Sequence, residues 1–472
     1  MNGKHPRART SYLLLGMTLL GAAAFARPAL AQTTPTAAPA FGQEPAATPP
    51  AQAPPVTSLD EPSLEPGVAA RSYLQPGAHL TETVNSNLRS QSGLGGSGLI
   101  GITRVLGSLD MKRLWSRYDL NLNYIGGLSL YSDAWGQPTQ THSLDASQRY
   151  SWRTGNVSVC DSMSYLPEGS FGYSGSSGGG SCGGSSSGGG GSSFGSVSNT
   201  DPRLSNSTAI NAQESLNPRS TVTFGGGYSF TDFLHTTSVA TVNSHGVNAQ
   251  AGYNRVLSRF DQIGVSYGFQ QFQFPTQGAG TIVSNVVQAL YAHQISGRMS
   301  LILGAGPQFT SVGVRMLANN PPSPAFSTVN LNVRASLKYR FPRTALEMSY
   351  ARYTSSGSGL QLGSESDVIR GGIQRPLNRI WSANFDAGYS HHVALQAAAG
   401  RALGGSFQDG FTGGGVTRHL GRFFSLAMHY QYAYEYFSST ACKGGLIDCS
   451  HSFNRHIADV TLSWHPLPIR LD

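Results

Sequence analysis

Residues 327–353 read STVNLNVRASLKYRFPRTALEMSYARY and carry the pattern that decides the fold. Along its first half, apolar and polar residues alternate without a break. The apolar parity holds Val329, Leu331, Val333, Ala335, Leu337 and Tyr339, and the polar parity holds Thr328, Asn330, Asn332, Arg334, Ser336, Lys338 and Arg340. A period of two is the period of a β-strand, so the segment predicts a strand with one apolar and one basic, hydrogen-bonding face. The chain then turns at Phe341-Pro342-Arg343 and alternates again through Leu346, Met348 and Tyr350.

The same alternation recurs along the chain. It is clearest at 119–131, 220–230, 262–270, 299–309, 379–390 and 422–436. Together these segments predict an all-β protein, a transmembrane antiparallel β-barrel of about 16–18 strands, depending on whether 80–88 and 205–216 are counted. Barrels of about 8 strands are filled by side chains, whereas 16–18 strands leave an aqueous lumen.

Tight and long connections alternate between these segments. Six tight connections, spaced by about 40 residues, contain turn-forming Pro, Gly, Asn or Ser. Each of them also has one arginine at or just before the start of the next strand. These arginines are Arg219, Arg259, Arg298, Arg343, Arg379 and Arg422. Longer polar segments lie between them, at 132–140, 277–280, 316–324, 355–366, 391–409 and 438–450. Short turns at one end and long loops at the other are typical of membrane barrels.

The N-terminal residues predict export. Lys4, Arg7 and Arg9 precede an apolar stretch at 12–25, and Ala29-Leu30-Ala31 supplies a small-residue cleavage site. These features favour a cleaved signal peptide over a retained membrane anchor. We therefore expect a signal peptide at 1–31, a disordered Pro/Ala/Thr-rich leader at 32–72, and a barrel at 73–472 with a Gly/Ser-rich insertion at 167–204.

Composition agrees with a barrel and excludes other classes. Charged residues make up 12% and the mean hydropathy is −0.19. After the signal, no run approaches the roughly 20 apolar residues of a spanning helix. The formal net charge of +8 includes several signal-peptide residues, and no Lys/Arg cluster with interleaved aromatic residues predicts nucleic-acid binding.

Four cysteines fall into two local pairs, Cys160 with Cys182 and Cys442 with Cys449. Cysteines in an exported chain predict disulfides, here two loop staples. His451 and His456 lie near Cys449, but the spacing matches no standard zinc site, and we expect neither a metal nor a cofactor.

At this point the chain resembles bacterial outer-membrane β-barrel proteins of the porin-like kind, over residues 73–464. The resemblance implies a Gram-negative outer membrane reached by the Sec pathway, contact with its lipid and lipopolysaccharide, and insertion by the barrel-assembly machinery. It also implies periplasmic tight turns and extracellular long loops. Members usually end on an aromatic residue, for which Trp464 is the best match, although the chain continues to Asp472.

Two groups of side chains are candidates for function at the inner and outer faces. Arg334, Lys338 and Arg340 form the densest inward basic row, which either favours anions in a pore or is a set of hydrated wall charges. The outward tyrosines predict an interfacial aromatic girdle rather than a sugar-stacking site. They are Tyr430, Tyr432, Tyr434 and Tyr436. The Gly/Ser tract is either a pore-constricting loop or a surface insertion.

Three functions remain open from the sequence. We expect a water-filled pore for small polar solutes and no enzymatic activity. The first alternative is a non-enzymatic surface or secretion role, either an exit port for polysaccharide or an adhesin. The second is an outer-membrane hydrolase using His391, His392 or His429, although no nucleophile or metalloprotease signature accompanies these histidines.

Overall fold

The computed structural model describes residues 72–86, 98–132, 138–166, 202–234, 242–275, 280–317, 320–356, 362–396, 405–437 and 452–471. The predicted signal peptide, the leader apart from Ser72, and most of the predicted 167–204 insertion lie outside these residues. In the described part of the chain, no helix is long and apolar enough to cross a membrane.

The described elements are β-strands. The first half of the chain contains β1 (Tyr73–Ser86), β2 (Leu99–Leu114), β3 (Tyr118–Tyr131), β4 (Thr139–Ser151), β5 (Gly155–Leu166), β6 (Arg203–Asn217), β7 (Ser220–Phe233), β8 (Ser244–Val256), β9 (Asp261–Gln273) and β10 (Ile282–Ser296). The second half contains β11 (Met299–Val312), β12 (Arg315–Leu317), β13 (Asn320–Ser323), β14 (Phe326–Arg340), β15 (Ala345–Ser355), β16 (Leu362–Pro376), β17 (Trp381–Gln396), β18 (Ser406–Leu420), β19 (Phe424–Phe437), β20 (Ser452–Trp464) and β21 (Ile469–Arg470).

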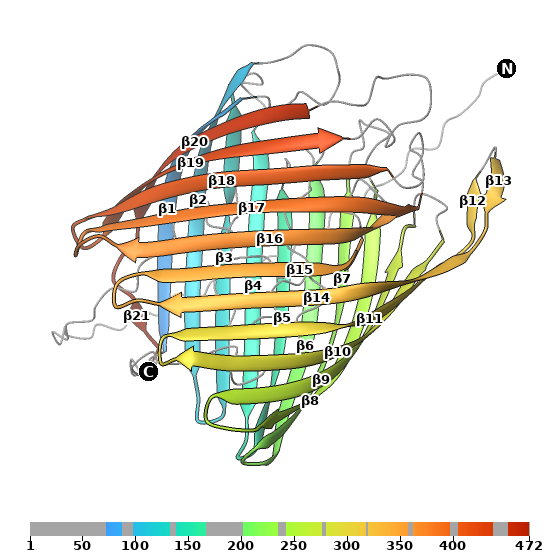
Figure 1. Ribbon diagram of the computed structural model, residues 1–472. Helices are drawn as coiled ribbons and strands as arrows, with labels where there is room; N and C mark the ends of the chain where they lie inside the picture. Colours follow the sequence, from blue (N-terminus) through green and yellow to red (C-terminus); the bar gives the residue numbers. More distant parts are fainter. Residues whose placement is uncertain are drawn as a thin grey trace, which may run out of the picture. The chain divides into compact units, whose positions relative to one another are not determined.

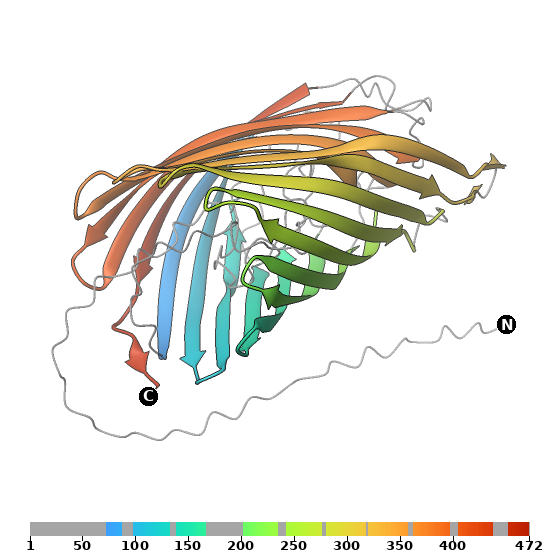
Figure 2. The same cartoon turned by 60° about the horizontal axis from the view of Figure 1, so that its bottom comes forward.

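Eighteen long strands, β1–β11 and β14–β20, form one closed antiparallel barrel. Each pairs with its neighbours in the chain, and β1 also pairs with β20 from Ala78↔Trp464 to Asn85↔Ile457. Figure 2 shows this closure as blue β1 beside the red C-terminal strands. The predicted barrel is confirmed, at the upper end of the predicted strand range. β6 starts at Arg203, just inside the predicted insertion.

The two faces of the barrel wall have opposite polarity. On β14, Leu331 is 58% exposed and its neighbour Asn332 only 1%. The exposed parity of β9, β11 and β19 is likewise apolar, with Val265, Leu303 and Met428 turned outward. The buried parity carries mainly Ser, Thr, Asn, Gln and Gly, with some apolar side chains such as Ile302 and some ionisable ones such as His429. Apolar residues outside and polar residues inside invert a soluble core and are the polarity that a membrane barrel requires.

Eight tight turns gather at one end of the barrel, along the left and lower edges of Figure 1. They include the six predicted turns and two more, at 115–117 and 152–154. Both chain ends of the barrel, Tyr73 and Trp464, lie at this end, and the small β12–β13 hairpin lies at the other. β21 follows β20 and pairs with Tyr73 and Leu74 of β1, so residues beyond Trp464 remain part of the sheet.

The barrel wall splits between β14 and β15. Their pairing ends at Val333↔Arg352, although β14 continues to Phe326 alongside β11. Beyond this point β15 lies against β11 instead, because Thr354 hydrogen-bonds to Gln308 and Thr310 on the inner face of β11. The long-loop ends of β15, β16 and β17 therefore turn into the barrel, and we call them the inward strand ends (353–355, 362–366 and 390–395).

The prediction of irregular segments at 355–366 and 391–409 is wrong at 362–366, 391–396 and 406–409, while 357–361 and 397–404 lie outside the described residues. β16 begins at Leu362, β17 runs to Gln396 and β18 begins at Ser406. These stretches lack the apolar alternation because both of their faces meet protein rather than lipid on one side and water on the other. Leu362 and Leu395 are accordingly both buried.

Candidate functional site: the inner wall of the barrel

One sector of the inner wall, from β7 to β9, is built from glycine and small polar residues. On β9 the inward residues are Gln262, Gly264, Ser266, Gly268 and Gln270. They pair across to inward residues of β8, such as Asn254 opposite Gly264 and Gly252 opposite Ser266. A Cβ built on Gly268 would meet no atom within 4 Å, so space is open beside the wall at this position.

The predicted basic row lies on β14 in the alternating positions expected from the sequence. Arg334, Lys338 and Arg340 share the inward parity with Asn332. Lys338 Nζ lies 3.7 Å from Glu347 on β15, and both side chains remain partly exposed. An exposed ion pair of this kind contributes little to stability, about 0–1 kcal/mol.

Above the basic row, hydrogen bonds between amides and hydroxyls join four strands. Gln288 Nε2 donates to Asn332 Oδ1 at 2.9 Å, and Asn332 Nδ2 donates to Gln308 Oε1 at 2.9 Å. Gln308 Nε2 donates in turn to Ser284 at 2.7 Å and to Thr354 at 2.6 Å. All five side chains are buried. The network fixes the end of β15 to the inner face of β10 and β11.

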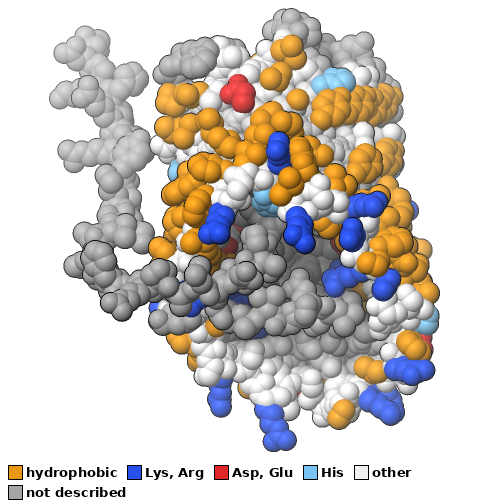
Figure 3. Space-filling model, turned by 90° about the vertical axis from the view of Figure 1, so that its left-hand side faces the viewer, with side chains coloured by type: hydrophobic (Ala, Val, Ile, Leu, Met, Phe, Trp, Pro, Cys, Tyr) orange, Lys and Arg blue, Asp and Glu red, His pale blue; other side chains and the backbone are white. Residues whose placement is uncertain are grey.

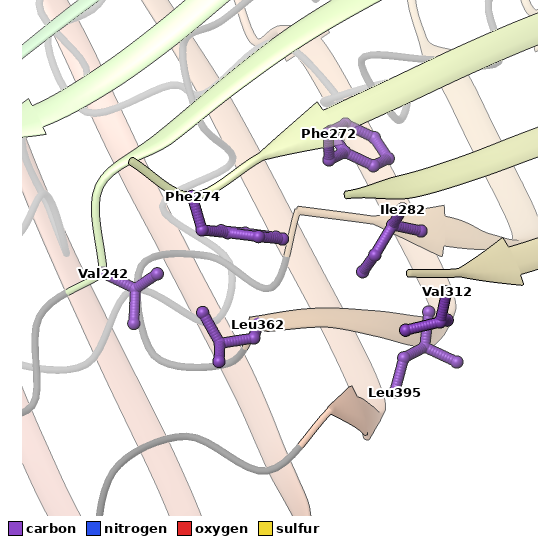
Figure 4. Close-up of a cluster of buried hydrophobic side chains, with 7 residues drawn as sticks. All are labelled: Val242, Phe272, Phe274, Ile282, Val312, Leu362 and Leu395. Carbon is purple, nitrogen blue, oxygen red and sulfur yellow. The ribbon is translucent and has the colours of Figure 1, made fainter. Parts of the chain in front are cut away.

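An apolar cluster holds the inward strand ends of β16 and β17 against the inner side of β9, β10 and β11. Figure 4 shows its side chains converging inside the barrel. The inner apolar cluster consists of Val242, Phe272, Phe274, Ile282, Val312, Leu362 and Leu395. Gly363, which follows Leu362 in the chain, has φ +74°, and a Cβ there would overlap Ile282 Cδ1. Glycine is therefore required at this point, where the strand end of β16 lies against β10.

A serine–histidine–aspartate contact lies beside this cluster. Ser366 Oγ is 2.8 Å from His392 Nδ1, and His392 Nε2 lies 2.6 Å from Ser390 Oγ and 3.3 Å from Asp409. Ser390 also donates to Asp409. Ser366, Ser390 and Asp409 are 0% exposed, so no substrate reaches the hydroxyl groups. The arrangement joins β16, β17 and β18 and does not support the hydrolase alternative.

Further ionisable side chains are buried along β16–β20. His429 Nδ1 lies 3.4 Å from Asp459 on the next strand, and Arg370, Glu435 and Arg455 are also inward and buried. His391 takes the opposite parity of β17, so the three histidines considered for catalysis lie in three different environments. The alternation along β19 puts His429 and Glu435 on one face, but the sequence alone gives no sign that the inner wall here is so rich in charge.

The remaining predicted site residues fall as follows. Cys160 is buried on β5 and is not a free thiol, while Cys182, Cys442 and Cys449 lie outside the described residues, so both pairings stay predictions. Tyr430 and the tyrosines after it lie on the outward parity of β19. Trp464 ends β20 and is exposed. The part of the chain that the structure describes contains no group of three His, Cys, Asp or Glu side chains placed to hold a metal.

Comparisons with known proteins add solved structures of similar architecture. No family model matches the chain, and no curated protein matches it. OccK2 (OpdF) of Pseudomonas aeruginosa is 9% identical with a TM-score of 0.41, covering 84% of this chain and 98% of its own. OprD of the same organism is 8% identical with a TM-score of 0.39, covering 85% and 97%. The iron-catecholate receptor Fiu of E. coli is 9% identical with a TM-score of 0.39, covering 83% and 81%.

Proposed function

We propose that the protein is a pore of the bacterial outer membrane that passes small polar solutes. The observation that carries the proposal is the closed ring of eighteen strands with an apolar outer and a polar inner face. A ring of this size encloses more volume than its own wall side chains fill. In the same proposal, Sec export delivers the chain and the tight turns face the periplasm.

The inward strand ends give the pore its selectivity in this proposal. They place the amide network and the inner apolar cluster inside the ring, so that solutes pass along the remaining wall, past β7–β9 and the basic row of β14. Arg334, Lys338 and Arg340 favour anionic solutes there, because a low-dielectric wall strengthens the field of each charge.

Conductance across a planar bilayer tests the pore. The refolded protein is expected to open discrete channels, and a salt gradient is expected to give a reversal potential with anion preference. Replacing two of the three residues of the basic row, in the variant Lys338→Gln/Arg340→Gln, should move this potential towards zero. A sealed bilayer contradicts the pore, and a cation preference contradicts the role of the basic row.

A further inference from the structure

The tight-turn end of the barrel carries one arginine in every turn. The set comprises Arg117, Arg153, Arg219, Arg259, Arg298, Arg343, Arg379 and Arg422, and we call it the arginine ring. All eight are exposed, and none of the residues in these eight turns is acidic. Because the eight turns join consecutive strand pairs of a closed barrel, the charges surround its whole rim. Figure 3 shows Lys and Arg side chains around this end of the molecule.

Large apolar side chains are exposed at the same turns. Each arginine has one within three residues. They are Trp115, Trp152, Leu216, Leu257, Phe260, Ile295, Phe341, Leu377, Ile380 and Phe423. Cations also stack on aromatic rings here: the Arg259 guanidinium lies 4.6 Å from the ring of Phe260, Arg113 lies 4.9 Å from Trp115, and Arg418 lies 5.4 Å from Trp381. Of these three cations, Arg259 belongs to the arginine ring, and its guanidinium lies against an exposed apolar side chain.

Carboxylates near the ring are already engaged with other donors. Glu214 accepts a hydrogen bond from Trp152 Nε1 at 2.7 Å. Asp261 accepts from Ser258 at 2.6 Å and from Tyr291 at 2.8 Å, and it lies 2.8 Å from His293 Nδ1. These hydrogen bonds leave Glu214 and Asp261 charged, but the eight turns themselves carry eight arginines and no acidic residue, so the turns are positively charged.

We propose that the arginine ring binds the headgroups of anionic phospholipids in the leaflet at the tight-turn end. A guanidinium group can donate two parallel hydrogen bonds to two oxygens of one phosphate. The exposed apolar side chains beside it enter the acyl region of the same leaflet. The alternation of the two around the full circumference fits a lipid annulus. A soluble polyanion would leave the apolar side chains in water, and a single docked protein would use one sector of the rim.

Lipid retention measures this binding. The purified protein is reconstituted in vesicles of equal parts phosphatidylcholine and phosphatidylglycerol, extracted gently, and analysed for co-purifying lipid. We expect enrichment of phosphatidylglycerol that high salt removes. Glutamine at four of the eight turns (Arg219, Arg298, Arg343 and Arg379) should lower the enrichment by about tenfold or more, because each basic residue adds to attraction at an anionic surface.

Lysine at the same four positions is the matched control, because it keeps the charge and loses the paired donors. A partial enrichment is expected for it. Retention of the two lipids in the ratio supplied, or equal enrichment by wild-type protein and glutamine variant, overturns the proposal. The four single glutamine variants carry the same test if the quadruple variant does not fold. The readout is independent of conductance, so a sealed barrel would not affect it.

Discussion

Leu331 and Asn332 are adjacent in the chain, but one faces outward and the other is buried in a hydrogen-bond network. In a strand, a shift of one residue exchanges the two environments. A side chain in this barrel is therefore placed by its parity, and two apolar neighbours would force one of them inward. At two positions, a single residue is expected to affect stability through more than its parity. Gly421 has a backbone conformation that favours glycine, and His465 is a buried group that can bind a proton.

Gly421 tests the backbone requirement in the turn between β18 and β19. Its φ is +87°, a region that residues with a Cβ avoid, although nothing lies within 4 Å of a Cβ built there. Gly421→Ala is expected to destabilise the barrel by about 1–2 kcal/mol through backbone strain alone. Gly297→Ala, in an equally open tight turn without a positive φ, is the control and should change the free energy of unfolding little. Urea unfolding in lipid vesicles measures both, and equal effects would show that strain is not the cause.

His465 gives the stability of the tight-turn end an expected dependence on pH. It lies past β20, with its ring 5.0 Å from that of His79, and burial lowers the pKa of His465. The folded state therefore favours the neutral ring. Above the ordinary histidine pKa of about 6.5, His465 is neutral in both the folded and the unfolded state, and the folded barrel keeps its full stability. As the pH falls below that value, the unfolded state binds a proton at His465 more readily than the folded state does, so the folded barrel loses stability.

His465→Asn should accordingly weaken the loss of stability between neutral pH and about pH 5. At each of the two pH values, samples are heated to increasing temperatures and run on a gel. The measurement is the temperature at which the band of the folded barrel is replaced by the band of the unfolded chain. His419→Asn, at the same end of the barrel, is the control. An unchanged difference between the two pH values in the His465 variant would contradict the assignment.

At the scale of elements, the inward strand ends are the feature that sets this barrel apart from a simple ring. Two different interactions hold them: the amide network through Thr354 and the inner apolar cluster through Leu362 and Leu395. Both join strands that are not neighbours in the barrel order. Their packing is therefore a tertiary contact added to the sheet, and it can be weakened without breaking strand pairing.

Leu362→Ala tests this contact. Truncating a fully buried leucine leaves a cavity, and we expect a loss of about 2–4 kcal/mol with a rise in channel conductance as the strand ends loosen. Leu377→Ala, at an exposed tight turn, is the matched control and should stay within about 0.5 kcal/mol. Unfolding in urea and single-channel recording supply the two measurements. A destabilised variant with unchanged conductance would mean that these ends do not restrict the pore.

At the scale of the whole molecule, an apolar outer face and a polar inner face must persist around the complete ring. Val265 and Gly268 lie on opposite faces of β9, near its middle. Val265→Arg should cost about 2–4 kcal/mol, because it places a charge in lipid. Gly268→Arg points into open space on the inner side and should be tolerated, with reduced conductance. The folded fraction in vesicles distinguishes them, and equal tolerance of both would exclude membrane placement of this wall.

The elements that were predicted from the sequence can be compared with those that the structure contains. Alternation predicted the faces of β3, β9, β11, β14, β17 and β19, and the Arg-bearing turns that join them. It missed the turns at 115–117 and 152–154, where tryptophan replaces the usual turn residues. It also took the inward strand ends for loops, because their side chains meet protein on both faces. The buried contact of Ser366 with His392 could not be foreseen, since it depends on where those ends go.

The sequence by itself determined the strand class, the outward and inward parity and six of the eight tight turns, because each of these follows from interactions within a few residues. Only the tertiary structure decided that eighteen strands close, that β14 and β15 separate, and which polar groups meet inside. The hydrogen bond between Thr81 and Thr461 joins residues 380 apart, at the seam between β1 and β20. An alternation with a period of two indicates which face of the sheet a side chain lies on, but it does not indicate which strand will pair with it.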